Sequence, residues 1–140
     1  MKTLFVAAVM GICVLSSVPA GAETISFAAG YDRLAKDCGR DIEKLCGNVK
    51  LGGGGVKACL EHNRAKLSPG CRVTQAETFA LLTKRLQAQA TAVQVCDRDR
   101  GQYCRGVQPN DGNQLSCLLK ASKVVSGSCK QVIVDAGWND

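Results

Sequence analysis

The cysteines of this chain fall into two sets with the same internal spacing. Eight of the nine cysteines belong to the pattern, four in each set: Cys38, Cys46, Cys59 and Cys71, then Cys96, Cys104, Cys117 and Cys129. The successive intervals are 8, 13 and 12 residues in both sets. Three matching intervals indicate a tandem repeat with a period of 58 residues. The sequence therefore predicts two copies of one structural unit, over 38–71 and 96–129.

Residues between the cysteines also match at this period. The aligned pairs are Arg40-Asp41 with Arg98-Asp99, Val49 with Val107, Gly54 with Gly112, Leu60 with Leu118, and Ser68 with Ser126. We interpret the two Arg-Asp pairs as local features, with the aspartate in the first turn of a helix, where the helix dipole favours a negative charge.

A run of four glycines, Gly52 to Gly55, raises the hypothesis of a phosphate-binding loop in the first copy. Such a loop needs a Gly-Lys-Ser/Thr sequence that opens a helix, whereas Val56 follows the glycines here. The second copy has turn-forming residues at 109–111 and a single glycine, Gly112. The run therefore predicts a connection between helices, in which Gly54 and Gly112 supply a backbone conformation that other residues avoid.

The first 22 residues have the features of a cleavable secretory signal peptide. Lys2 gives a positive start, an apolar run extends from Leu4 to Leu15, and small residues form an Ala-x-Ala site that ends at Ala22. The apolar run is shorter than a membrane-spanning helix requires. We expect removal of 1–22, no transmembrane segment after cleavage, and delivery to a periplasm or to the cell exterior.

The 118 residues after Ala22 contain eight cysteines. An even number of cysteines in an exported chain is typical of a disulfide framework. The whole sequence has three Phe, two Tyr and one Trp, so it offers little aromatic bulk for a core. We therefore expect disulfides to supply stability that a larger core would otherwise provide.

Apolar residues recur at helical intervals in each copy. In the first copy they form two stripes: Cys38, Ile42, Leu45 and Cys46, then Val56, Cys59, Leu60 and Leu67, with Ser68-Pro69-Gly70 as the expected end of the second helix. Two short helices joined by a loop form an antiparallel hairpin. The sequence predicts an all-α fold, namely two tandem disulfide-stapled helical hairpins joined by a long helix.

The segments outside the two copies complete this organisation. No glycine or proline interrupts the chain from Cys71 until Gly101, and Thr74 to Glu77 match a helix capping box. Apolar spacing continues through Phe79, Leu82, Leu86, Val93 and Cys96. We expect an N-terminal lead-in over 23–37, a connecting helix over 72–95, straight or kinked near 88–92, and a C-terminal tail over 130–140. In the tail, residues 131–135 ("QVIVD") fit either a helix or a strand.

A hairpin also constrains the pairing of the cysteines. The inner two flank the loop and the outer two meet at the open end, so the predicted bridges are nested: Cys38–Cys71, Cys46–Cys59, Cys96–Cys129 and Cys104–Cys117. The smaller ring has 14 residues, and a bridge that closes such a ring contributes roughly 3 kcal/mol in the chain-entropy model. Exchange of partners between the two copies stays open as an alternative.

The motif of the first copy extends beyond its cysteines. It includes Asp41-Ile42, Leu45-Cys46, Val49, the glycine-rich loop, Cys59-Leu60, Asn63, Leu67-Ser68 and Cys71. With these residues the copy resembles the cysteine-rich repeat of the Golgi apparatus protein family, also known as the cysteine-rich fibroblast growth factor receptor or E-selectin ligand family. The second copy departs from the motif at Arg100 and Ala121, where the first has Ile42 and Asn63.

The large animal members of that family carry many repeats and a transmembrane segment, so this chain resembles the short secreted proteins built from the same unit. The resemblance implies a stapled helical fold and a non-catalytic binding role. It does not extend the growth-factor and selectin ligands of the large members to this chain.

Few residues offer catalytic or metal chemistry. A general base needs a nucleophile and an orienting group, and the only histidine, His62, aligns with Lys120 in the second copy, so we interpret it as a solvated surface residue. Cysteines eight or more residues apart do not match structural zinc sites, and no Cys-x-x-Cys is present. We predict no cofactor, no metal and no enzymatic activity. The alternative is a redox or thiol-dependent enzyme that uses a free cysteine or His62.

The charge of the chain is the remaining functional signal. Without 1–22 the chain has 17 basic and 12 acidic residues, a net charge of +5. The basic residues that gather in and after the copies are Lys44, Lys50, Lys57, Arg64, Lys66, Arg72, Lys84, Arg85, Arg98, Arg100, Arg105, Lys120, Lys123 and Lys130. Positive charge favours anionic polymers, but no aromatic platform suits nucleic acid.

The leading functional prediction is therefore a secreted or periplasmic cysteine-rich repeat protein that serves as a binding or envelope-associated structural module. Its partner would be an unknown protein or an anionic envelope glycan. For the basic residues themselves, solvation of the helices is the favoured explanation, and a binding face is the alternative.

Overall fold

The computed structural model describes residues 22–50, 52–108 and 112–138. These residues form six α-helices and one short 3-10 helix, with no strand among them: α1 (Phe27–Cys46), α2 (Gly55–His62), η1 (Arg64–Lys66), α3 (Pro69–Val95), α4 (Asp97–Tyr103), α5 (Asn113–Lys120) and α6 (Gly127–Ala136). The all-α prediction is confirmed. The predicted signal peptide, apart from Ala22, and the turn at 109–111 lie outside the described residues.

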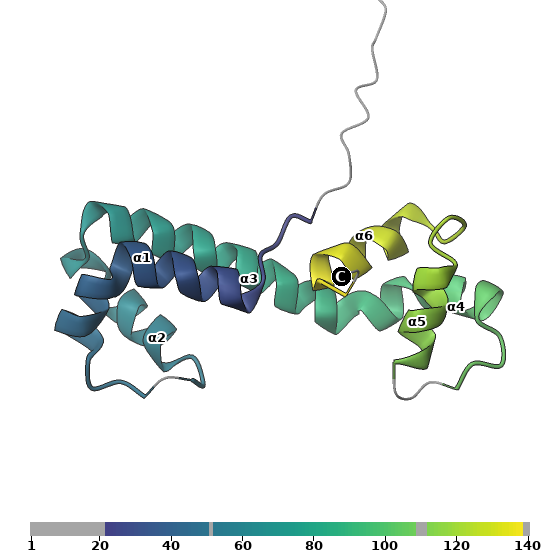
Figure 1. Ribbon diagram of the computed structural model, residues 1–140, viewed down its shortest axis with the longest axis horizontal. Helices are drawn as coiled ribbons and strands as arrows, with labels where there is room; N and C mark the ends of the chain where they lie inside the picture. Colours follow the sequence, from purple (N-terminus) through teal and green to yellow (C-terminus); the bar gives the residue numbers. More distant parts are fainter. Residues whose placement is uncertain (1–21, 51, 109–111, 139–140) are drawn as a thin grey trace, which may run out of the picture.

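The molecule is elongated, and α3 runs along most of its length (Figure 1). Helix α1 packs antiparallel against the first half of α3, and α6 packs antiparallel against its second half. In this view, the short helices α2 and α5 lie below the two ends of the elongated molecule. No described helix is both long and apolar enough to cross a membrane.

The 58-residue period extends from the cysteines to the helices. Helix α2 at 55–62 corresponds to α5 at 113–120, and the first residue of α3, Pro69, corresponds to the first residue of α6, Gly127. Each unit therefore consists of three helical segments. The first two form the predicted hairpin, and a third helix packs against them. Helix α3 is the third helix of the first unit and, in its second half, the first helix of the second unit.

The third helix begins where the sequence analysis expected a helix to end. Ser68 is the N-cap of α3, its hydroxyl accepts a hydrogen bond from the Cys71 N–H at 3.3 Å, and Pro69 occupies the first turn. Serine at the N-cap and proline at the next position are typical of a helix start. The predicted capping box at Thr74 is wrong, since Thr74 lies inside α3 and donates to Asp37 instead.

Helix α3 buries two different faces. Its first half buries Cys71, Gln75 and Thr78, and its second half buries Ala88 and Ala92. At 100° per residue, these two stripes lie about 90° apart around the helix. The single apolar stripe predicted through Leu86 and Val93 is wrong, because these two side chains are 52% and 69% exposed. Each half of the helix turns its buried face toward a different partner helix.

The long helix ends at Val95, and Cys96 separates it from α4. Residues 88–92 lie within continuous α3, and the break in the helix comes at the cysteine. The ambiguous residues 131–135 are helical, within α6, which ends at Gly137 with a φ of 70°. Helix α1 begins at Phe27, so most of the lead-in at 23–37 is helical as well.

Two separate hydrophobic cores form, one in each unit. The first is built around Cys38, Cys46, Leu60, Leu67 and Cys71. The second is built around Cys96, Cys104, Leu118, Val125, Cys129 and Ile133. The disulfide sulfurs are thus part of each core, which agrees with the shortage of aromatic residues.

The predicted role of Gly54 and Gly112 is confirmed. Each is the N-cap of the second helix of its unit, with φ values of 80° and 73°. This left-handed conformation is readily adopted by glycine and costly for most other residues. Gly52 and Gly53 also have positive φ values, so most of the glycine run is conformationally required.

Candidate binding surfaces

The four disulfides join helices within each unit in a nested arrangement. The outer bridges, Cys38–Cys71 and Cys96–Cys129, link the first helical segment of each unit to the third helix, with Cα atoms 4.7 and 4.8 Å apart. The inner bridges, Cys46–Cys59 and Cys104–Cys117, link the first segment to the second helix across 6.0 Å. All eight cysteines of the described residues are therefore bridged, and none crosses between the units.

In each unit, an aspartate accepts hydrogen bonds from the serine that caps the start of the third helix. Ser68 donates to Asp41 Oδ2 from its hydroxyl at 2.7 Å and from its backbone N–H at 2.9 Å. Ser126 makes the same two contacts with Asp99, at 2.6 and 2.8 Å. These bonds explain why the Asp and the Ser recur together at the 58-residue period.

The helix-dipole interpretation holds for Asp99, in the first turn of α4, but it is wrong for Asp41, which lies in the interior of α1. Two hydrogen bonds from Ser68 hold the pKa of Asp41 below its usual 3.8. The bond from the hydroxyl has the larger effect, and the bond from the backbone N–H adds to it. Those from Ser126 lower the pKa of Asp99 in the same way. Both aspartates therefore stabilise the fold as carboxylates.

This arrangement predicts a loss of stability in acid. A carboxylate with a lowered folded-state pKa contributes fully above its unfolded pKa, here about 4, and the contribution is lost as the pH falls through the folded pKa. We expect the urea midpoint to decrease from about pH 4 downward. The double variant Asp41→Asn, Asp99→Asn should have a lower midpoint at pH 7 and a flatter pH profile.

The matched control is Glu43→Gln, which removes an exposed carboxylate of α1 that has no hydrogen-bond or ion-pair partner among the described residues. It should leave the acid profile unchanged. A double Asp variant with the wild-type profile would contradict the role assigned to these carboxylates.

His62 is the last residue of α2 and is exposed. Its side chain has no hydrogen-bond or ion-pair partner among the described residues. Within the same residues, no three His, Cys, Asp or Glu side chains lie close enough to hold a metal ion. In the described part of the chain, therefore, no nucleophile or orienting group is hydrogen-bonded to the His62 side chain.

Several basic side chains predicted to form a charged surface have local partners. Lys57 pairs with Glu61 at 3.1 Å and Lys84 with Glu23 at 3.0 Å, while Arg100 pairs with Asp97. Arg85 donates to the carbonyl oxygens of Ile25 and Gly137, at 3.5 and 3.4 Å, and so joins the two units at the middle of α3. The charge is therefore spread along the molecule, and part of it is structural.

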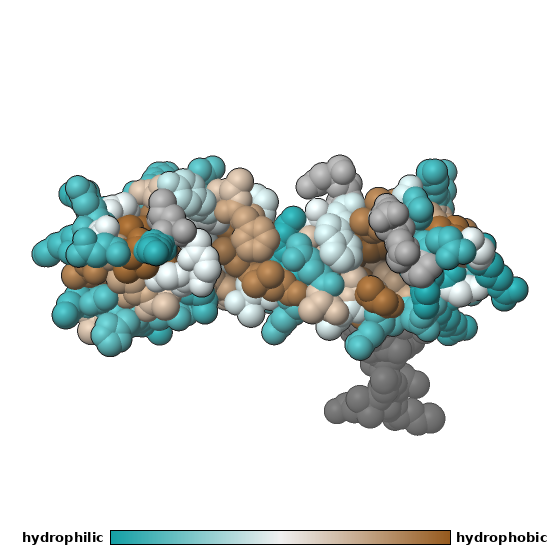
Figure 2. All heavy atoms as spheres, turned by 90° about the horizontal axis from the view of Figure 1, so that it is seen from below, coloured by the Kyte–Doolittle hydropathy of each residue, from teal (hydrophilic) through white to brown (hydrophobic). Residues whose placement is uncertain are grey.

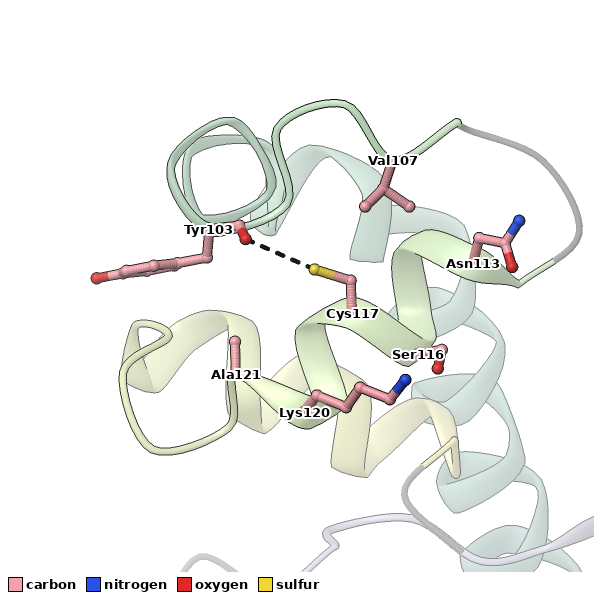
Figure 3. Close-up of a pocket in the computed structure, with 7 residues that line it drawn as sticks. All are labelled: Tyr103, Val107, Asn113, Ser116, Cys117, Lys120 and Ala121. Atoms are coloured by element: carbon pink, nitrogen blue, oxygen red, sulfur yellow. Dashed lines mark hydrogen bonds between the residues drawn. The ribbon is translucent and has the colours of Figure 1, made fainter.

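A hollow of about 500 Å³ opens in the second unit, between the end of α4 and α5 (Figure 3). Its lining residues are Tyr103, Val107, Asn113, Ser116, Cys117, Lys120 and Ala121. The Cys117 sulfur faces the Tyr103 carbonyl oxygen at 3.7 Å, but a bridged sulfur carries no proton, so this is a van der Waals contact. The lining has one cation, Lys120, and no carboxylate or histidine.

An apolar groove of about 430 Å³ lies in the first unit, along α1 and α2. It is lined by Phe27, Gly30, Tyr31, Leu34, Ala35, Gly39, Ile42, Gly52, Val56 and Leu82. Phe27 and Tyr31 are 53% and 64% exposed. Figure 2 shows apolar surface between hydrophilic side chains along one long face of the molecule.

A third hollow, of about 650 Å³, separates α2 from α3 in the first unit. It is lined by Lys57, Glu61, Arg64, Gln75, Ala76, Phe79, Ala80, Thr83 and Lys84. Sequence reasoning named Lys57, Arg64 and Lys84 only as dispersed charges, and it missed Gln75. The repeat alignment indicates that these positions differ between the copies. Gln75 and Lys57 are polar, whereas Ile133 and Leu115, the residues that align with them, are apolar.

Comparison with known proteins shows a similarity to a cysteine-rich protein of the Golgi apparatus. The chain is 28% identical over 104 residues to Golgi apparatus protein 1 of Rattus norvegicus, a match that covers 71% of this chain and 8% of that protein. The chain thus spans a small part of the relative's length. No protein-family model and no solved structure matches the chain. The similarity agrees with the resemblance inferred from the cysteine-rich motif.

Proposed function

We propose that this protein is a secreted or periplasmic, non-catalytic module that binds a protein partner or an anionic envelope glycan. The observation that carries the proposal is the twice-repeated stapled unit, whose bridges use all eight cysteines of the described residues. Disulfides of this kind belong to an oxidising compartment. The similarity to a protein named for the Golgi apparatus supports the same assignment.

The surroundings of the polar side chains support a binding role over catalysis. Thiol chemistry requires a thiolate, and the bridged sulfurs do not supply one. The hollow in the second unit holds a lysine and hydroxyl groups without a carboxylate or histidine. A redox or thiol-dependent enzyme that uses a free cysteine or His62 is therefore the weaker reading, and nucleic acid is not among the proposed partners.

The N-terminal residues support export with cleavage after Ala22. The Glu23 nitrogen lies 2.8 Å from Asp135 Oδ1, and the Thr24 hydroxyl donates to the Asp135 carbonyl oxygen at 2.7 Å. Cleavage would convert the Glu23 amide into an ammonium group beside this carboxylate. A charge-assisted hydrogen bond is stronger than a neutral one, so processing would strengthen an existing contact.

Intact mass and thiol titration of the exported protein test the proposal. After expression of the full chain with export to an oxidising periplasm, the mass should equal that of residues 23–140 less the eight hydrogens lost in four disulfides. No thiol should react with iodoacetamide in the native protein. One or two reactive thiols, or retention of the chain in the cytoplasm, would favour the enzyme alternative or reject export.

A further inference from the structure

The two units differ at one set of equivalent positions. In the second unit, Leu115, Leu119 and Trp138 pack against the hydrophobic core that contains buried Ile133. At the positions that match Leu115, Leu119 and Ile133, the first unit has Lys57, Glu61 and Gln75, and these line the hollow between α2 and α3. These positions thus carry apolar side chains in the second unit, where Leu115 and Ile133 line a hollow of only about 80 Å³, and polar side chains in the first, where the hollow is about 650 Å³.

Gln75 is the unusual member of this hollow. Its side chain is 4% exposed, yet its Oε1 atom has no hydrogen-bond partner among the described residues. Buried polar atoms are normally hydrogen-bonded, and an exception calls for an explanation. Because Gln75 lines the hollow, a rotation of its side-chain amide presents Oε1, which is closed to solvent in the unbound protein, to a hydroxyl or N–H donor of a bound molecule.

The charges around Gln75 favour an anion. Three cations, Lys57, Arg64 and Lys84, and one carboxylate, Glu61, line the hollow. Lys57 is paired with Glu61 and Lys84 with Glu23, but the Arg64 guanidinium has no hydrogen bond or ion pair with another described residue. A guanidinium binds a carboxylate through two parallel hydrogen bonds, so Arg64 is free to bind an acidic group.

Phe79 adds an apolar surface to the same hollow. Its ring is partly buried against the first core, and the Lys57 ammonium lies 5.8 Å from the ring centroid. The site therefore offers an aromatic ring, an unsatisfied acceptor and an unpaired guanidinium. A volume of about 650 Å³ is within the usual range for ligand sites.

We infer that this hollow binds an acidic sugar residue of a glycan, a sugar ring that carries a carboxylate. The carboxylate pairs with Arg64, a hydroxyl donates to Gln75 Oε1, and the C–H face of the ring packs on Phe79. A saccharide combines all three features within one ring, whereas an acidic peptide spreads them over several residues. The inference rests on the proposed binding function and names the ligand class and its site in the first unit.

Calorimetry with the exported, fully oxidised protein tests the site. The probe is a tetrasaccharide of alternating glucuronic acid and N-acetylglucosamine, compared with the same saccharide reduced at its carboxylates and with an acidic hexapeptide. Arg64→Gln should weaken binding of the acidic probe about tenfold or more, as expected for loss of a charged hydrogen bond. The matched control Lys123→Gln removes the same charge from an exposed position of the second unit and should change affinity less than twofold.

A second variant addresses the buried amide. Gln75→Ile introduces the residue that the second unit has at this position, so the fold accommodates it. The variant should abolish binding without lowering the thermal midpoint. In the wild type, the probe should shift the NMR signals of the Gln75 side-chain amide and the Phe79 ring.

The outcomes that would contradict the inferred sugar site differ from those that would contradict the proposed function. Equal weakening by Arg64→Gln and Lys123→Gln, or equal binding of the reduced saccharide, would overturn the site and leave a general binding role intact. If the hexapeptide bound more tightly than the saccharide and its binding depended on Arg64, the ligand would be an acidic peptide and the inferred sugar would be wrong. Absence of binding by the wild type would overturn the inference, whereas the mass and thiol results decide the proposed function separately.

Discussion

Full reduction of the four disulfides is expected to unfold most of the helical structure at moderate temperature. Loss of a native disulfide from a small secreted domain typically costs about 2 to 5 kcal/mol, and the total stability of such domains is only about 5 to 15 kcal/mol. The bridged sulfurs also form much of each core. Circular dichroism of the protein with and without reductant measures the change in thermal midpoint.

The outer and inner bridges provide an internal comparison. The chain-entropy model assigns about 3.7 kcal/mol to a bridge that spans 33 residues and about 3 kcal/mol to one that spans 13. The outer cysteines are also fully buried, so their replacement leaves a cavity. Cys38→Ala, Cys71→Ala should therefore lower the midpoint more than Cys46→Ala, Cys59→Ala. A reduced protein with an unchanged midpoint would reject the stapled-core account.

Leu60→Ala is expected to have the largest effect of a single substitution. Leu60 is completely buried in the first core, and removal of a buried leucine typically costs about 2 to 5 kcal/mol because it loses apolar burial and leaves a cavity. Urea denaturation measures the loss. Leu60→Met, which nearly conserves volume, should cost less than about 1.5 kcal/mol.

The destabilisation should be confined to the first unit, because the two cores are separate. In repeat proteins each unit is stabilised by its own packing and by its contacts with neighbours. Hydrogen exchange in Leu60→Ala should therefore accelerate in α1 and α2 while α5 and α6 keep their protection. Equal acceleration in both units would show that the chain unfolds as one cooperative body.

The hollow between α2 and α3 was only partly visible in the sequence. Its cations and the helix that carries Gln75, predicted over 72–95, follow from the sequence, but the packing of this helix on the first core as the third helix of the unit does not. Ser68-Pro69 fits the end of a helix but is equally typical of a helix start. Gln75 lies one turn after the bridged Cys71, so it falls on the face that meets the first core.

The apolar pattern of α3 failed for a related reason. A periodicity argument assumes that one face of a helix meets one partner. Helix α3 packs against α1 in its first half and α6 in its second, so its buried face changes along its length. Small residues, Ala88 and Ala92, occupy the contact in the second half, and small residues give a weak periodic signal.

The sequence by itself determined the repeat and the helical class, because these follow from covalent spacing and from short-range helix periodicity. It favoured nested bridges, but the tertiary structure decided against an exchange of cysteine partners between the units. The tertiary structure alone also decided that Asp41 and Asp99 hold the third helices, that Cys96 breaks the long helix, and that equivalent positions line a large polar hollow in the first unit and a small apolar one in the second. These features depend on which side chains meet across helices far apart in the chain. Such contacts are set by three-dimensional packing, which local spacing does not specify.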